Sequence, residues 1–202
     1  RLGLGLMGIH EWLLKRNYKY EVVPELHQWL SVYKGVSDDV SKKQADRLSI
    51  SRPVANRSIA PTGTIGMVAG TTTGIEPVYA VSYKRRYLKG TKWHYQYAID
   101  SVAQDLVNRL GVDPDNVESA VDLAKDYERR IKFQADVQDY VDMAISSTIN
   151  LPPRDSQEFS AKDFGLTLAK YAPRLRGFTC YPDGARGGQP LTSVPYAEAV
   201  EK

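Results

Sequence analysis

Ala60-Pro61-Thr62-Gly63-Thr64-Ile65-Gly66, followed closely by Thr71-Thr72-Thr73-Gly74-Ile75-Glu76-Pro77, is the part of the sequence that decides the fold. Residues 60–77 include four glycines, five threonines, two prolines and one charged residue, Glu76. Glycine permits positive φ and a close approach of the main chain to a ligand. Exposed backbone N–H groups in such a segment can bind an anion. The segment therefore has two interpretations, a structural turn or a phosphate-binding loop.

The loop is preceded by Ser58-Ile59-Ala60, which indicates the end of a buried strand, and is followed by residues that favour a short helix at about 65–69. Further strands are expected in three places, the second of them a short strand or a loop: Val78–Tyr83, Ile145–Leu151 and Gly177–Tyr181.

Helical periodicity dominates the rest of the chain. Leu2, Leu6, Ile9 and Leu13 recur at the spacing of one helix face. A long helix is expected from Trp93 to Leu110, with Gly111 as its terminating glycine. Helices therefore alternate with short strands, which indicates an α/β fold whose strands pair partly with sequence outside this chain.

Composition excludes several classes of protein. The chain has 202 residues, a net charge of +3 and a single cysteine, Cys180, so it forms no internal disulfide. No apolar run reaches the ~18 residues of a membrane span. Tyr83–Lys89 mixes cationic with aromatic side chains, a pattern that can bind single-stranded nucleic acid. The small net charge instead favours a solvent-exposed segment at the end of a strand. We expect a cytoplasmic protein with no membrane and no nucleic-acid partner.

Other candidate residues give weaker signals. Gly3-Leu4-Gly5-Leu6-Met7-Gly8 has dinucleotide-fingerprint spacing but no preceding strand, so close packing of small residues is the better interpretation. Glu76 is either held by neighbouring backbone N–H groups or catalytic, and the first is favoured. Cys180 is expected to be buried and inert. No metal site is expected, because the three histidines lack ligand spacing: His10, His27 and His94.

Four motifs in order resemble the C-terminal portion of the ribonucleotide reductase catalytic chain. They are the stretches 1–8, 59–77, 145–152 and 177–186. Ile145–Pro152 is similar to the "S-K-T-I-N-L-P" segment of the adenosylcobalamin-dependent class II enzymes, with Ser147 in place of lysine. Gly177–Arg186 is similar to their "G-x-T-x-Y-R-D-G-S-R" segment, with Pro182 for arginine and Ala185 for serine.

The resemblance implies that residues 1–191 form the later part of a ten-stranded α/β barrel, helix-rich with short strands, and that 192–202 form a tail. It implies conversion of ribonucleotides to deoxyribonucleotides by thiyl-radical chemistry. The substrate phosphates would be held by a loop made of Pro61, Thr62, Gly63, Thr64, Ile65 and Gly66. Active-site lining is assigned, less firmly, to Ser146, Ser147, Thr148 and Asn150.

The resemblance also implies partners. Adenosylcobalamin would be bound mainly by the rest of the enzyme, an N-terminal portion would join covalently or as a separate chain, and a thioredoxin- or glutaredoxin-type protein would supply electrons. Cys180 matches none of the family's reactive cysteines, so no catalytic residue is assigned and the chain alone is expected to be inactive. The alternatives are a stand-alone nucleotide- or phosphate-binding module and a class I large-subunit fragment. The class I alternative is disfavoured, because Cys180-Tyr181 occupies the positions at which class I enzymes have two adjacent tyrosines.

Overall fold

A computed structural model describes residues 1–157, 159–182 and 191–202. Its helices are α1 (Ile9–Leu14), α2 (Pro24–Arg47), α3 (Gly63–Ala69), α4 (Ser101–Leu110), α5 (Ala120–Leu123), α6 (Tyr127–Gln138), α7 (Ala161–Tyr171) and α8 (Tyr196–Val200), with 3₁₀ turns η1 (Pro114–Asn116) and η2 (Ala172–Arg174). Its strands are β1 (Ser82–Lys89), β2 (Lys92–Ile99), β3 (Thr148–Leu151), β4 (Thr179–Pro182) and β5 (Leu191–Ser193).

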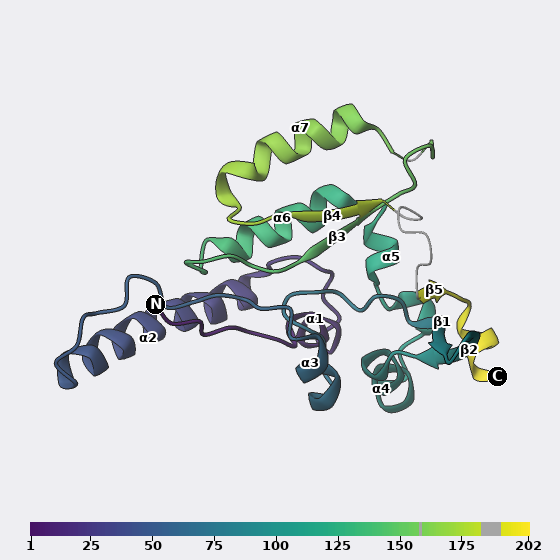
Figure 1. Ribbon diagram of the computed structural model, residues 1–202, viewed down its shortest axis with the longest axis horizontal. Coiled ribbons are helices and arrows are strands. Elements are labelled where there is room, and N and C mark those ends of the chain that lie inside the picture. Colours follow the sequence, from purple (N-terminus) through teal and green to yellow (C-terminus); the bar gives the residue numbers. More distant parts are fainter. Residues whose placement is uncertain (158, 183–190) are drawn as a thin grey trace.

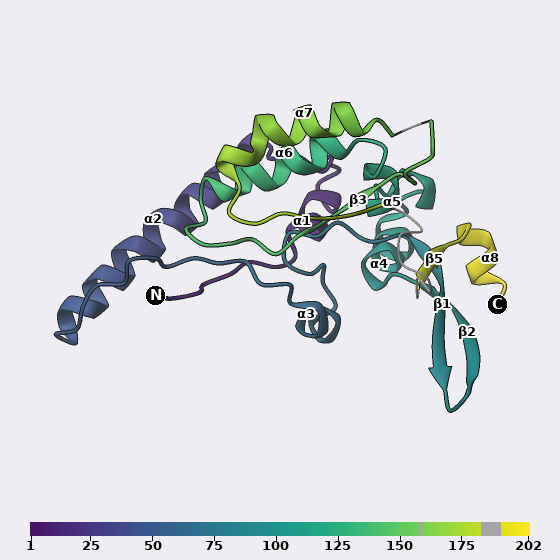
Figure 2. The same ribbon diagram turned by 45° about the horizontal axis from the view of Figure 1, so that its top comes forward.

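Four extended segments run parallel and form the centre of the molecule. Leu4 bridges Arg57, Ile59 bridges Ile145, and β3 pairs with β4. Helices α2, α6 and α7 each lie between two consecutive segments in the sequence, and Figure 2 shows all three on one side of the extended segments. This is the alternation of parallel strands and covering helices that defines an α/β fold, as predicted.

The core lies between these helices and the extended segments. One buried cluster packs α1, α2 and α6 against the extended segment that contains Ile59. Its members include Leu13, Leu30, Ile59 and Phe133. A second cluster packs α7 against α6 and β3. Figure 1 shows α7 above α6, which overlaps β4 in that view, and Figure 2 shows α6 and α7 side by side above β3. These contacts fix the strand ends, where the candidate residues lie.

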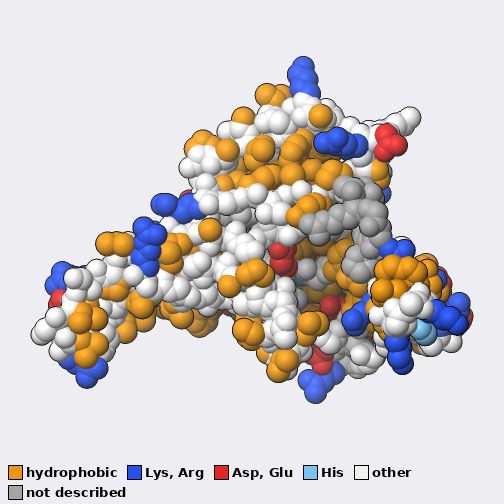
Figure 3. Space-filling model, viewed as in Figure 1, with side chains coloured by type: hydrophobic (Ala, Val, Ile, Leu, Met, Phe, Trp, Pro, Cys, Tyr) orange, Lys and Arg blue, Asp and Glu red, His pale blue; other side chains and the backbone are white. Residues whose placement is uncertain are grey.

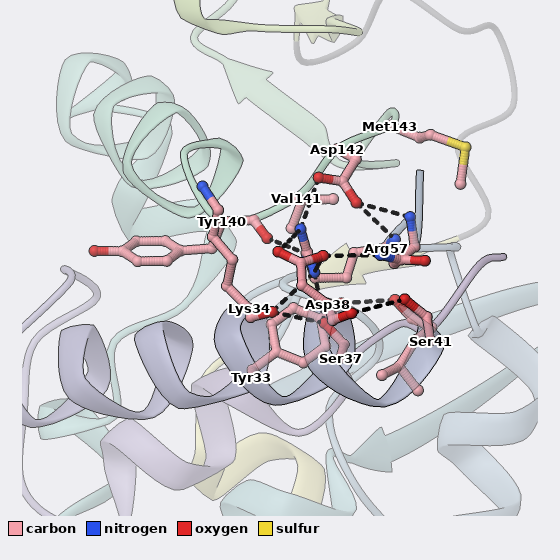
Figure 4. A network of polar contacts seen from close by, with 12 residues as sticks. Tyr33, Lys34, Ser37, Asp38, Ser41, Arg57, Tyr140, Val141, Asp142 and Met143 are labelled. Carbon is pink, nitrogen blue, oxygen red and sulfur yellow. Dashed lines mark hydrogen bonds and ion pairs between the residues drawn. The ribbon is translucent and has the colours of Figure 1, made fainter. Parts of the chain in front are cut away.

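A buried arginine ties α2 to two of the parallel segments (Figure 4). The Arg57 side chain is 1% exposed and pairs with Asp38 of α2 at 2.6 Å and with Asp142 at 2.7 Å. Its Nε also donates to the Tyr140 carbonyl at 2.8 Å. Because a buried guanidinium is costly unless paired, this cluster holds α2 firmly in register with the sheet.

Two predicted helices are partly wrong. Residues 92–99 form β2, which pairs with β1 in an antiparallel hairpin, and only Ser101–Leu110 is helical. The Asp100 side chain caps that helix by accepting from Val102 N at 2.9 Å, and Gly111 terminates it at φ 65°, as expected. Leu2–Leu6 precede the helix, because Leu4 pairs with Arg57 and Gly8 at φ 78° starts α1.

Other strand predictions were mixed. Val78–Ala80 lie in a loop, and the strand begins only at Ser82. The predicted strands near 145–151 and 177–181 are confirmed as β3 and β4.

Residues 192–202, expected as a tail, include part of β5, which pairs with β1, and helix α8, whose Glu198 accepts from Tyr97. The resemblance of residues 183–186 lies outside the described part of the chain.

Candidate functional site

The loop after Ile59 turns sharply into helix α3. Thr62 has φ 50°, and its carbonyl accepts from Gly66 N at 2.7 Å to close the first turn. The predicted short helix is therefore confirmed. Among the described residues, no hydrogen bond engages the backbone N–H groups of Gly63, Thr64 or Ile65, and all three residues are exposed. The first N–H groups of a helix have no partner within it, so these donors face solvent.

The second Gly/Thr segment supports this loop from behind. Gly74 N donates to Thr62 Oγ1 at 2.9 Å. Gly74 has φ 50°, and a Cβ on it would lie 3.1 Å from the Ala60 carbonyl oxygen. A Cβ on Gly66 would lie 2.5 Å from Thr73 Cγ2. Glycine is favoured at Gly74 by its positive φ and the nearby Ala60 carbonyl, and at Gly66 because a Cβ there would overlap the Thr73 methyl group.

A cavity of about 950 Å³ opens at the carboxyl ends of the parallel segments. Its lining includes Gly63 from the loop, Glu76 from the supporting segment, Thr148 and Asn150 from β3, and Tyr181 from β4. In open α/β sheets, ligands bind at this end of the strands. The cavity is therefore the candidate site.

The predicted site residues divide around this cavity. Gly63, Thr148 and Asn150 line it. Ser147 is buried beneath its wall and Ser146 is exposed outside its lining. The other loop residues lie outside the lining and are placed next to Gly63 by the turn: Pro61, Thr62, Thr64, Ile65 and Gly66.

Glu76 is held by a buried ionic network under the cavity floor. Its Oε1 accepts from the backbone N–H of Thr148 at 2.6 Å, and its Oε2 pairs with Arg130 of α6. Arg130 also donates to Ser147 Oγ at 2.5 Å and to the Tyr20 hydroxyl oxygen at 2.8 Å. Burial raises the pKa of the Glu76 carboxyl, and the nearby Arg130 charge opposes that rise.

Glu76 is thus both paired and hydrogen-bonded to a backbone N–H, which agrees with the favoured interpretation of its sequence position. Sequence reasoning missed its partner Arg130, and also Tyr20, to which Arg130 donates. The isolation of Glu76 in an uncharged stretch was the available signal, because a buried carboxylate requires a cation from elsewhere in the chain. It could not indicate which cation.

His10 is also buried beside this network. Its Nδ1 accepts from Val78 N at 2.9 Å, and its ring meets Tyr20 edge-on with centroids 5.2 Å apart. Burial, reinforced by the Arg130 charge, lowers the pKa of His10 to about 3. His10 is therefore a neutral packing residue.

Two absences hold for the described residues. They contain no group of three or more His, Cys, Asp or Glu side chains able to hold a metal ion. None of their helices is long and apolar enough to cross a membrane. Cys180 is half-buried in β4, and burial raises the pKa of its thiol, so it is not an activated nucleophile.

Parallel strands that carry a glycine-rich loop and a cavity at their carboxyl ends define an α/β domain with a candidate ligand site. The family described as "Ribonucleotide reductase, barrel domain" matches residues 54–172 of the sequence. The chain belongs to this family, as its motifs predicted.

Known proteins similar to this chain are consistent with the family match. The vitamin B12-dependent ribonucleoside-diphosphate reductase of Mycobacterium tuberculosis (strain CDC 1551 / Oshkosh) is 28% identical over 96% of this chain and 33% of its own length. A putative adenosylcobalamin-dependent ribonucleoside-triphosphate reductase of Mycobacterium phage D29 is 24% identical over 100% and 34%. The crystal structure of a B-12 dependent (class II) ribonucleotide reductase superposes with a TM-score of 0.72 at 16% identity, covering 100% of this chain and 32% of that one. The chain spans about a third of the length of these relatives.

Proposed function

We propose that this chain forms the substrate-phosphate side of a ribonucleotide reductase that converts ribonucleotides to deoxyribonucleotides. The observation that carries the proposal is the free backbone N–H groups at Gly63–Ile65, next to a cavity that Gly63 lines, in a member of this family. The donors suit phosphate oxygens, because glycine leaves the backbone uncovered and Thr64 adds an exposed hydroxyl.

The lining of the cavity suits the non-reacting part of a nucleotide. Thr148 and Asn150 place a hydroxyl and an amide beside the loop, and both can bond to ribose or phosphate oxygens. Glu76 accepts a hydrogen bond from the Thr148 N–H, and Arg130 donates one to the Thr148 carbonyl, so both fix the position of Thr148. In this proposal the network acts on the position of the cavity wall, and the substrate lies between the loop and β3.

The radical steps need groups from outside these residues. Formation of a thiyl radical and delivery of two electrons require several thiols, and this chain has one cysteine, whose pKa is raised by burial. We therefore propose that the chain is inactive alone and works with an N-terminal portion of a reductase. Electrons would come from a thioredoxin- or glutaredoxin-type protein in the cytoplasm.

Adenosylcobalamin is the cofactor that the relatives' names suggest. No histidine or cysteine is among the described residues that line the cavity, so this lining offers cobalt no imidazole or thiolate ligand, and its one sulfur atom is the thioether of Met67. The residues present do not form a site for the cofactor's metal. We propose that the rest of the enzyme holds it, and we assign it no residue of this chain.

Nucleotide binding by the chain tests the role of the loop. Binding of cytidine diphosphate should be measured by isothermal calorimetry, with cytidine as the ligand that lacks phosphates. Thr64→Glu should weaken diphosphate binding about tenfold or more, because it places a negative charge among the phosphate donors. Thr91→Glu, in the exposed hairpin turn, is the matched control and should bind as the original chain does.

The whole activity is tested by mixing the chain with the N-terminal portion of a B12-dependent reductase, adenosylcobalamin, an effector nucleotide and a dithiol. Deoxyribonucleotide should form only in the full mixture. Failure of this assay with both pieces folded, together with intact diphosphate binding, would instead favour a stand-alone nucleotide-binding module.

A further inference from the structure

The hairpin of β1 and β2 gathers positive charge that the composition of the whole chain conceals. Residues 82–99 contain five cationic side chains and no carboxylate, so they carry +5, whereas the whole chain carries +3. The five are Lys84, Arg85, Arg86, Lys89 and Lys92. Within the described part of the chain, none of them forms an ion pair. The expectation of no nucleic-acid partner rested on the small net charge of the chain, and this local charge is the feature of a surface that binds anions.

The outer part of this hairpin projects from the body of the molecule. β5 pairs with β1 at residues 83–85, and the structure describes no third strand beside residues 86–95. Figure 2 shows the two strands extending away from the helices, and in Figure 3 Lys and Arg side chains lie on several sides of the lobe that carries them. Helix α8 reaches the base of the hairpin, where Glu198 accepts from the Tyr97 hydroxyl at 2.9 Å. The projecting part is therefore open to a partner.

Cations and aromatic rings share one face of the projecting part. Arg86 is paired directly with Tyr95, and Lys84 and Trp93 lie two positions away on their own strands, so all four side chains are on the same side. The Arg86 guanidinium lies 4.4 Å from the centroid of the Trp93 ring, and Lys84 Nζ lies 4.8 Å from that of Tyr95. The two rings nevertheless remain 54% and 58% exposed. We call this set the cation–aromatic face: Lys84, Arg86, Trp93 and Tyr95.

We propose that the cation–aromatic face binds single-stranded nucleic acid, with bases stacked on the two rings and phosphates bound by the two cations. Residues two apart on a strand are separated by about 6.8 Å and point to the same side, so Trp93 and Tyr95 offer neighbouring stacking sites. Sheets that bind RNA stack two or three bases on aromatic side chains in this way. Arg86 lies over Trp93 while its Nε has no hydrogen-bond partner among the described residues, so the ring positions this cation and no described carboxylate neutralises it.

Two other anionic partners, a membrane surface and an acidic protein segment, fit the hairpin less well. The turn between the strands is Lys89-Gly90-Thr91-Lys92, and Leu88 is the only large aliphatic side chain that the described hairpin exposes, so the tip has little to insert into lipid. An acidic segment would pair with the cations but would leave the rings without flat partners. Cations combined with exposed rings are the pattern by which proteins bind single strands.

Fluorescence anisotropy tests the stacking. The 202-residue chain is titrated into a labelled oligodeoxythymidine of about 20 nucleotides at about 0.05 M salt, and binding is the expected result. Trp93→Ala should weaken binding about tenfold because it removes one stacking platform, and Trp93→Phe should restore most of the affinity. Trp29→Ala, at a 58% exposed position of α2, is the matched control and should bind as the original chain does. Circular dichroism checks that the variants fold.

Salt dependence tests the phosphate contacts. Lys84→Gln combined with Arg86→Gln should weaken binding and reduce the slope of log K against log salt by about 1.4, because two phosphate contacts are lost. Lys42→Gln combined with Lys162→Gln removes the same charge at exposed positions of α2 and α7 and should leave the slope unchanged. Equal slopes for the two double variants would show that net charge, and not this face, binds the strand.

Three results would overturn the proposal: no binding of the oligonucleotide, equal affinity for Trp93→Ala and Trp29→Ala, or equal slopes in the salt titration. Polyglutamate that competes as well as the oligonucleotide would assign the face to an acidic protein segment instead. Binding to vesicles of phosphatidylserine and phosphatidylcholine that the oligonucleotide does not displace would assign it to a membrane surface. Thr64→Glu should leave oligonucleotide binding nearly unchanged, and Trp93→Ala should leave cytidine diphosphate binding unchanged, so failure here leaves the proposed function standing.

Discussion

Replacing His10 by asparagine should remove a specific part of the acid sensitivity of this fold. The Nδ1 atom of His10 accepts a hydrogen bond from Val78 N, and Nε2 is buried with no hydrogen-bond partner among the described residues. Protonation at Nδ1 would break the bond to Val78 and place a charge near Arg130 in the core. The fold therefore requires a neutral imidazole, and His10→Asn keeps an acceptor for Val78 while removing the titration.

The magnitude follows from the lowered pKa. His10 titrates near 6.5 when unfolded and at about 3 when folded. Below pH 6.5 the unfolded chain binds the additional proton, so stability is lost as the pH falls from 6.5 toward 3. At about 1.36 kcal/mol per pH unit, the loss from this group reaches about 2 kcal/mol at pH 5. For a chain of this size, that corresponds to a fall of about 4–8 °C in Tm.

Urea denaturation at pH 7.5 and pH 5.0, at constant ionic strength, measures this loss. The original chain should lose about 2 kcal/mol more than His10→Asn between the two pH values. The variant will have a lower stability at pH 7.5, because asparagine fills less of the buried site, but the comparison concerns only the change with pH. Equal pH dependence in the two proteins would refute the argument that His10 is held neutral by the fold.

Two paired substitutions test the supports of the cavity. Arg130→Met should lower the free energy of unfolding by about 3 kcal/mol, because it leaves Glu76 without its cation, whereas Lys132→Met, on the same helix and 55% exposed, should cost far less by urea midpoint. Gly66→Ala should cost about 1–3 kcal/mol, because its Cβ would overlap Thr73, whereas Gly63→Ala meets open space and should leave the Tm unchanged or slightly higher. Equal losses within either pair would contradict this account.

The loop and its helix were predictable because their signals are local. Glycine and threonine content, the preceding apolar residues and the short apolar run after Gly63 all act within a few positions, and α3 begins at Gly63. The same holds for Gly111, since a helix ends where a left-handed residue follows.

The hairpin and the network were not predictable from local pattern. Apolar residues within 93–110 recur at helical spacing, but Trp93, Tyr95 and Tyr97 also follow the alternating spacing of a strand. Pairing with β1 makes this first part of the segment the strand β2. Register between β1 and β2 depends on a partner strand whose position the spacing alone does not reveal. A propensity pattern that fits two structures is resolved only by tertiary contacts.

The position of Glu76 explains why the loop and β3 can form one site although 70 or more residues separate them. Glu76 follows the segment that supports Thr62 and reaches the backbone of Thr148. Arg130 binds both Glu76 and the Thr148 carbonyl. One buried ionic network therefore holds the Glu76 segment, β3 and α6 together, and the Gly74–Thr62 hydrogen bond attaches the loop to that segment. Under the proposed function, this arrangement would keep the phosphates and the ribose of one nucleotide at a fixed separation.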